Sequence, residues 1–143
     1  NLRLSSEPIY SDLIRKGDAD LIISMEPMEA LRYVGELDKG GCVVTSSQPF
    51  KNIPNYPSEA ALEAELNALP RCLRQPIEEL AKAHSMPKSA NIILLGMAAK
   101  YIEILSAEQL RESVGRVFAS KGEQVIEANL RAFDLGVELV GKE

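Results

Sequence analysis

The segment from Ala19 to Leu37, ADLIISMEPMEALRYVGEL, constrains the fold most because it changes from a strand pattern to a helix pattern. The unbroken apolar run 21–23 predicts a short central strand that is covered on both faces. Glu26 and Pro27 then open a helix, because proline at the first helical position loses no hydrogen bond and an acidic side chain complements the helix dipole. The carboxyl end of such a strand is where open α/β sheets place their sites.

A second strand follows the helix and completes a βαβ unit. Apolar residues keep helical spacing as far as Leu37, and the segment 38–41 (DKGG) ends the helix. The segment 42–47 (CVVTSS) is predicted to be the second central strand. Because such crossovers are nearly always right-handed, the two strands are expected to be parallel.

The chain before this unit also has a strand pattern. Residues 2–5 (LRLS) alternate apolar and polar side chains, which predicts a half-buried strand. Ile9, Leu13 and Ile14 are expected to hold the following loop against the core. Since the chain opens with Asn1 in this pattern, we expect that a segment precedes it.

The middle of the chain contains a long proline-rich loop and three short elements. The loop covers residues 48–57 (QPFKNIPNYP). Ser58 is a good N-cap for a helix over 59–69, and residues 71–75 predict a short edge strand. A further helix is predicted over 76–84.

The last fifty residues are predicted to be helical. Residues 91–102 are apolar nearly all round and predict a buried helix, in which Gly96 indicates close packing against another backbone. Ser106 and Gln109 form a capping box for the next helix. The final predicted helix, 121–140, has these apolar side chains near one face: Val125, Ile126, Leu130, Phe133 and Val137.

These patterns predict an α/β fold, a three-layer Rossmann-like domain with a short, mainly parallel sheet and a helical C-terminal third. The 143 residues suffice for a single domain, 1–143, with a real core. A net charge of −5, with the charges scattered, argues against nucleic acid as a partner. No signal peptide pattern is present, and the longest apolar run, 92–99, is too short to cross a bilayer, so we expect a cytoplasmic protein without a membrane partner.

Metal and nucleophile motifs are weak. Two cysteines and one histidine cannot by themselves make a zinc or iron–sulfur site; Cys42 is expected in the core, and a disulfide to Cys72 stays open. His84 lies where it can favour a helix C-terminus. Ser46 and Ser47 end a strand without a GxSxG elbow or a base, so they predict ligand contacts or capping groups rather than a nucleophile.

The strand-to-helix junction remains the best candidate for a ligand or docking site. Ser24 lies at the end of the strand, and Glu26 and Glu29 share a face of the helix. Paired carboxylates can do acid–base work or bind a metal, but Arg32 is placed to pair with Glu29. The glycines at 40–41 precede a strand, whereas a phosphate-binding loop follows one.

Four segments together resemble the small (β/γ) subunit of the 2-oxoacid:ferredoxin oxidoreductases, and most of all that of the indolepyruvate enzymes. They are EPMEALR at 26–32, NIILLG at 91–96, LSAEQLRES at 105–113 and NLRAFDLG at 129–136. The resemblance covers essentially the whole chain. Family domains normally begin with a strand and a glycine-rich GxGGxG turn, which these residues lack, so the chain resembles roughly the last three quarters of the subunit.

The resemblance implies an oxidative decarboxylation, in which a 2-oxoacid and coenzyme A give an acyl-CoA, CO2 and reduced ferredoxin. Thiamine diphosphate, Mg and [4Fe–4S] clusters are expected on a large partner subunit, and ferredoxin is an indirect partner. The small subunit would hold no catalytic residue; it would dock on the thiamine subunit and help to shape the coenzyme A site. Its docking or ligand candidates are Ser24, Glu26, Glu29, Arg32, Ser46, Ser47 and Asn91.

Two other readings stay open. The chain could be a stand-alone α/β module that binds a nucleotide or an acyl-CoA, or a homodimer in isolation. The docking patch could lie around Met97 and Tyr101, or on the proline-rich loop with Phe50 and Tyr56. The resemblance to the indolepyruvate enzymes implies an aryl 2-oxoacid as the substrate, and indolepyruvate, phenylpyruvate, pyruvate and 2-oxoglutarate all stay open, because enzymes for each of them share this domain.

Overall fold

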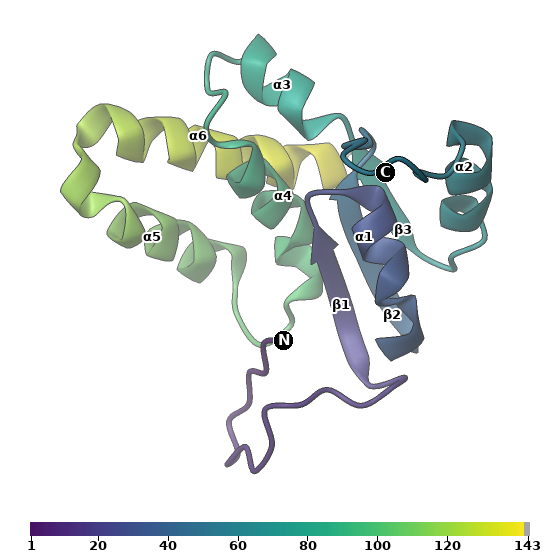
Figure 1. Ribbon diagram of the computed structural model, residues 1–143. Helices are drawn as coiled ribbons and strands as arrows, with labels where there is room; N and C mark the ends of the chain where they lie inside the picture. The colour runs from purple at the N-terminus through teal and green to yellow at the C-terminus, as the bar shows by residue number, and fades with distance from the viewer. Residues whose placement is uncertain (142–143) are drawn as a thin grey trace.

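A computed structural model describes residues 1–141 and contains a parallel sheet (Figure 1). Its strands are β1 (Ala19–Ser24), β2 (Leu37–Ser46) and β3 (Cys72–Gln75), in the order β1-β2-β3. The register pairs Ser24 with Thr45 and Ser46 with Gln75, so that the carboxyl ends of all these strands meet at one edge of the sheet. The predicted parallel βαβ unit, the central second strand and the short edge strand are confirmed.

Helices cover both faces of the sheet, which confirms the layered α/β class. Helices α1 and α2 lie on one side, α4 packs on the other side, and α6 packs behind α4 with α5 against it (Figure 1). The helices are α1 (Pro27–Arg32), α2 (Glu59–Asn67), α3 (Ile77–Ala83), α4 (Ala90–Ala98), α5 (Ala107–Val117) and α6 (Glu123–Val140), with short 3-10 turns at Val34–Glu36, Ala99–Tyr101 and Ala119–Lys121.

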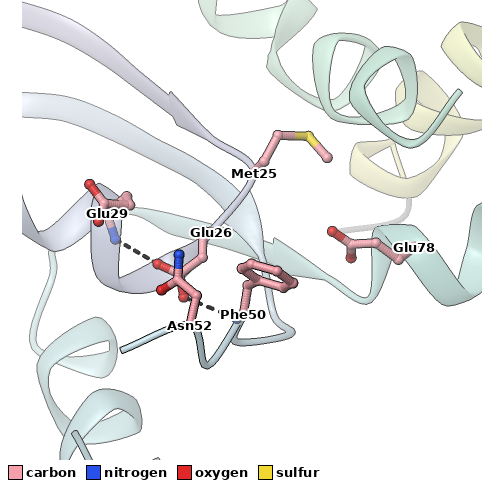
Figure 2. A pocket seen from close by; sticks show the side chains of 6 residues that line it. All are labelled: Met25, Glu26, Glu29, Phe50, Asn52 and Glu78. Carbon is pink, nitrogen blue, oxygen red and sulfur yellow. Dashed lines mark hydrogen bonds between the residues drawn. The ribbon is translucent and has the colours of Figure 1, made fainter. Parts of the chain in front are cut away.

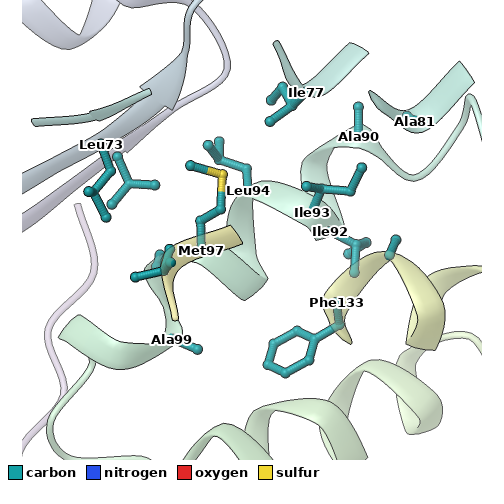
Figure 3. Close-up of a cluster of buried hydrophobic side chains, with 14 of the residues drawn as sticks. Leu73, Ile77, Ala81, Ala90, Ile92, Ile93, Leu94, Met97, Ala99 and Phe133 are labelled. Carbon is teal, nitrogen blue, oxygen red and sulfur yellow. The ribbon is translucent and has the colours of Figure 1, made fainter. Parts of the chain in front are cut away.

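The core lies between the sheet and the α4–α6 layer (Figure 3). Ile93 and Met97 of α4 belong to one cluster with Phe133 of α6 and Ile77 of α3, and all four side chains are almost completely buried. Cys42 is buried in the same cluster, as predicted. Helix ends also follow the sequence: Ser58 caps α2, and the capping box opens α5.

Helices α4 and α6 approach backbone to backbone, which confirms the close packing predicted for Gly96. A Cβ atom added at Gly96 would lie 2.2 Å from the carbonyl oxygen of Phe133. A Cβ atom added at Gly136 would lie 2.0 Å from the carbonyl oxygen of Ile93. Only glycine at both positions allows this crossing, and the two helices therefore act as one packed layer.

The prediction of a strand over residues 2–5 is wrong. Residues 1–18 form an irregular segment whose Leu2, Leu4, Ile9 and Leu13 side chains are exposed, while Ile14 is half-buried. Alternation alone does not make a strand, because a strand also needs a neighbour with which to form a ladder, and residues 2–5 pair with none of the described strands.

The first strand and its helix also differ from the prediction. Strand β1 is an edge strand rather than a central one in residues 1–141, and Ile23 is 43% exposed. Helix α1 ends at Arg32 and not near Leu37, because Leu37 pairs with Ala19 and already belongs to β2. The parallel ladder therefore takes Leu37, and the 3-10 turn Val34–Glu36 lies between α1 and β2.

The buried face of α6 is rotated relative to the predicted apolar face. Phe133 is buried, but Val125 and Val137 are exposed, because the glycine contact turns small side chains toward α4. The buried residues of α6 are Asn129, Ala132, Phe133, Gly136 and Val140. The proposed surface patch at Met97 is also wrong, since Met97 is buried in the core and Tyr101 is half-buried.

Candidate functional site

A hollow of about 360 Å³ lies at the carboxyl end of the sheet (Figure 2). It forms where the end of β1, the first turn of α1, the loop after β2 and the first turn of α3 come together. Open α/β sheets bind their ligands and partners at this edge. Six side chains line it: Met25, Glu26, Glu29, Phe50, Asn52 and Glu78.

The Glu26 carboxylate holds this region together. It is the N-cap of α1, where its Oε2 accepts a hydrogen bond of 2.9 Å from the backbone N–H of Glu29. Its other oxygen, Oε1, accepts from the backbone N–H of Phe50 at 3.4 Å and from the phenol of Tyr56 (Figure 2 shows the bonds to Glu29 and Phe50). One carboxylate therefore joins the helix N-terminus to two points of the proline-rich loop.

Tyr56 is the other half of this connection. Burial of the side chain raises the pKa of the Tyr56 phenol well above its ordinary value, and the hydrogen bond to Glu26 and the negative charge of that carboxylate raise it further. Tyr56 therefore keeps its proton and donates a hydrogen bond to Glu26 throughout the physiological pH range.

Two strand-end serines hold the walls of the hollow. The Ser24 hydroxyl donates to the carbonyl of Glu26 at 2.7 Å, and it accepts from the backbone N–H of Glu26 at 3.3 Å. The buried Ser46 hydroxyl donates to Glu78 Oε2 at 2.9 Å and accepts from the N–H of Gln48 at 3.1 Å. Both hydroxyls are used in positioning the backbone and the carboxylates.

The lining of the hollow is acidic. Glu26, Glu29 and Glu78 supply carboxylates, and no lysine or arginine is among the lining residues. Arg32 lies at the far end of α1 and pairs with Glu29, Nε to Oε1, at 3.1 Å, with both side chains about half exposed. Such an exposed pair neutralises little, so the hollow repels phosphate and favours cationic groups.

The structure brings only some of the predicted candidates together. Ser24, Glu26, Glu29 and Ser46 surround or support the hollow, whereas Ser47 is exposed and Asn91, exposed on the first turn of α4, does not line it.

Sequence reasoning did not include Asn52 and Glu78, and it named Phe50 and Tyr56 only as a docking patch. One signal in the sequence could have found them. The proline-rich loop directly follows strand β2 and helix α3 directly follows strand β3, so both segments begin at the carboxyl ends of parallel strands.

The residues present do not fit a metal or an iron–sulfur cluster. Across residues 1–141 no group of three His, Cys, Asp or Glu side chains could hold a metal ion. Cys42 and Cys72 are both thiols, and burial raises the pKa of the Cys72 thiol, which disfavours the thiolate that a metal requires. We find no helix in the same part of the chain that is long and apolar enough to cross a membrane.

A parallel α/β domain with an acidic hollow at its strand ends is typical of a binding or docking unit. The chain belongs to the pyruvate ferredoxin/flavodoxin oxidoreductase family, whose model matches residues 1–139.

The chain is also similar to curated subunits of indolepyruvate oxidoreductases. The chain is 32% identical to the indolepyruvate oxidoreductase subunit IorB of Pyrococcus horikoshii, over 92% of this chain and 68% of that protein. It is 33% identical to the subunit of the same name from Thermococcus kodakarensis, with the same shares of both chains, and 28% identical to that of Archaeoglobus fulgidus, over 90% and 66%. The resemblance found in the four segments is confirmed.

Proposed function

We propose that this chain is the subunit without redox centres in an indolepyruvate-type 2-oxoacid:ferredoxin oxidoreductase, and that it docks on the thiamine diphosphate subunit. The observation that carries the proposal is the match to IorB subunits over 90% or more of the chain. The geometry agrees with a docking role, because the polar groups of the hollow position backbone and one another and leave no nucleophile with a base.

The reaction of the assembled enzyme would be the oxidative decarboxylation of an aryl 2-oxoacid to an acyl-CoA, with ferredoxin as the electron acceptor. Thiamine diphosphate, Mg and the [4Fe–4S] clusters would lie on the partner subunit, and the enzyme would work in the cytoplasm. The names of the relatives favour indolepyruvate over other 2-oxoacids. The isolated chain would have no activity.

The contribution to coenzyme A binding is limited by charge. The carboxylates of Glu26, Glu29 and Glu78 repel a diphosphate, so the phosphates of coenzyme A would not lie in the hollow. We propose that this chain faces only the uncharged, thiol-bearing arm of coenzyme A in the assembled enzyme. The same carboxylates argue against a stand-alone nucleotide-binding module at this edge.

Co-expression with the large subunit encoded beside it tests the proposal. The complex would be purified through a tag on the small subunit, and indolepyruvate- and coenzyme A-dependent dye reduction would be measured. We expect a brown, thiamine-dependent complex whose activity disappears without the small subunit. Full activity in the large subunit alone would overturn the proposal.

A further inference from the structure

Two large apolar side chains stand out of the acidic hollow. Phe50 is 69% exposed and Met25 is 41% exposed, and both line the hollow with the carboxylates (Figure 2). We call Met25, Glu29, Phe50, Asn52 and Glu78 the strand-end face. Exposed apolar side chains that are grouped around a site commonly mark a protein interface.

The loop that carries Phe50 is held in place before any partner arrives. Glu26 accepts from the backbone N–H of Phe50 and from the Tyr56 phenol, so both ends of this stretch are tied to α1. A side chain presented on a fixed backbone loses little conformational entropy on binding. Phe50 therefore has the properties of a preorganised anchor.

The negative charge of the strand-end face indicates which kind of side chain it would bind. The strand-end face places the carboxylates of Glu29 and Glu78 on either side of an aromatic ring, and no lysine or arginine is among the residues that line the hollow. The exposed pair that Glu29 forms with Arg32 outside the lining is weak, so a second cation can still be attracted. A guanidinium or ammonium group can pair with carboxylates and also pack on an aromatic ring.

We propose that the strand-end face docks on the companion subunit of the oxidoreductase, that an arginine or lysine side chain of that subunit enters the hollow, and that an apolar side chain beside it covers Phe50. This inference rests on the proposed function, and it assigns the surface through which the chain docks on the companion subunit, that is, the thiamine diphosphate subunit.

Other occupants fit less well. A second copy of this chain in a two-fold contact would bring the same carboxylates toward one another. A phosphate-bearing ligand is repelled, and a free small cation would leave the exposed Phe50 ring uncovered.

The Phe50→Ala variant tests the apolar part of the proposed interface. Tagged wild-type chain and the Phe50→Ala variant would be compared for binding to the purified companion subunit by biolayer interferometry. We expect the affinity of Phe50→Ala to fall about thirtyfold, as for a central anchor. The matched control is Val117→Ala, because Val117 is 71% exposed on α5, away from the strand-end face, and its affinity should be unchanged.

Removal of charge tests the electrostatic part. The double variant Glu29→Gln/Glu78→Gln should associate about tenfold more slowly at low salt, and the difference should shrink as salt screens the attraction. Glu112→Gln/Glu127→Gln removes the same charge from exposed positions on α5 and α6 and should associate like the wild type. Circular dichroism melts would verify that every variant is folded.

The outcomes separate the inference from the function on which it rests. If the wild-type chain does not bind the companion subunit, both are overturned. If it binds, but the strand-end variants bind like their controls, or Val117→Ala alone weakens the complex, only the strand-end face is overturned. A wild-type homodimer that Phe50→Ala abolishes would assign the face to a second copy and would also overturn the inference.

Discussion

At the scale of single residues, Glu26 and Tyr56 hold the proline-rich loop against α1. The carboxylate caps α1 and at the same time accepts from the loop, so the helix start and the loop position depend on each other. A glutamate at an N-cap is less common than serine or aspartate, and its longer side chain is what allows the second contact. The local rule for helix starts is therefore modified here by a tertiary contact.

Tyr56→Phe should destabilise the fold by about 1 to 2 kcal/mol, because a half-buried hydrogen bond to a charged group is lost. Urea unfolding measures the change. Tyr10→Phe is the matched control, since Tyr10 is 95% exposed, and its free energy of unfolding should not change. Equal effects of the two substitutions would contradict the role given to Tyr56.

The raised pKa of Tyr56 also predicts a pH dependence. The folded state holds this proton more tightly than the unfolded state, whose tyrosine pKa is about 10. The stabilisation is fully present below that pH and is lost as the pH rises above it. The free energy of unfolding of the wild type should therefore fall more steeply than that of Tyr56→Phe above about pH 10. Parallel urea titrations at increasing pH measure the two slopes, and identical slopes would contradict the prediction.

At the scale of elements, the α4–α6 contact dominates the helical layer. Gly96→Ala should destabilise the protein by about 3 kcal/mol or more, because the added methyl group meets backbone atoms that cannot move aside. Thermal and urea unfolding measure the loss.

The control is Gly115→Ala within α5, where the nearest atom to an added Cβ is Leu130 Cδ2 at 3.9 Å. That variant should be more stable than the wild type by about 0.5 to 1 kcal/mol, because alanine favours the helix. A stable Gly96→Ala variant would show that the two helices can separate.

Element type was predictable wherever local signals agreed. Pro27, Ser58 and Ser106 opened helices as predicted, and the apolar segment 42–47 gave the central strand. The wrong predictions of element type have their cause in tertiary contacts. The helical spacing near Leu37 was overridden by the ladder to Ala19, and residues 2–5 had no neighbour in the described sheet with which to pair.

The site was predictable only in part for the same reason. Ser24, Glu26 and Ser46 could be placed because the ends of adjacent parallel strands must meet. Phe50 and Tyr56 contact Glu26 only because the irregular loop brings them there. Glu78 contacts Ser46 only because α3 begins at the carboxyl end of the sheet. No short-range pattern fixes such contacts.

At the scale of the whole molecule, two surfaces differ in the balance of their charges. The strand-end face is acidic and carries exposed Phe50. The α5–α6 pair carries charges of both signs, and Arg111 donates two hydrogen bonds to Asp134, of 2.7 and 2.9 Å. Asp134 raises the pKa of the Arg111 guanidinium through these bonds. Since a balanced surface attracts charged partners less, the strand-end face is the more selective of the two.

This division of the molecule predicts the order of amide hydrogen exchange. Amides of β2, α4 and α6 should exchange most slowly, because β2 has neighbours on both sides and the two helices are packed through the core. Amides of residues 1–18 should exchange fastest, because this segment is exposed and joins none of the described strands. The proline-rich loop, 48–57, should lie between the two. Glu26→Gln should move this loop toward the fast group without changing α5, because the neutral amide that replaces the carboxylate accepts more weakly from Phe50 and Tyr56. Exchange followed by mass spectrometry of peptic fragments measures all three groups. Slow exchange in residues 1–18, or a loop that does not respond to Glu26→Gln, would contradict this account of how the fold is held.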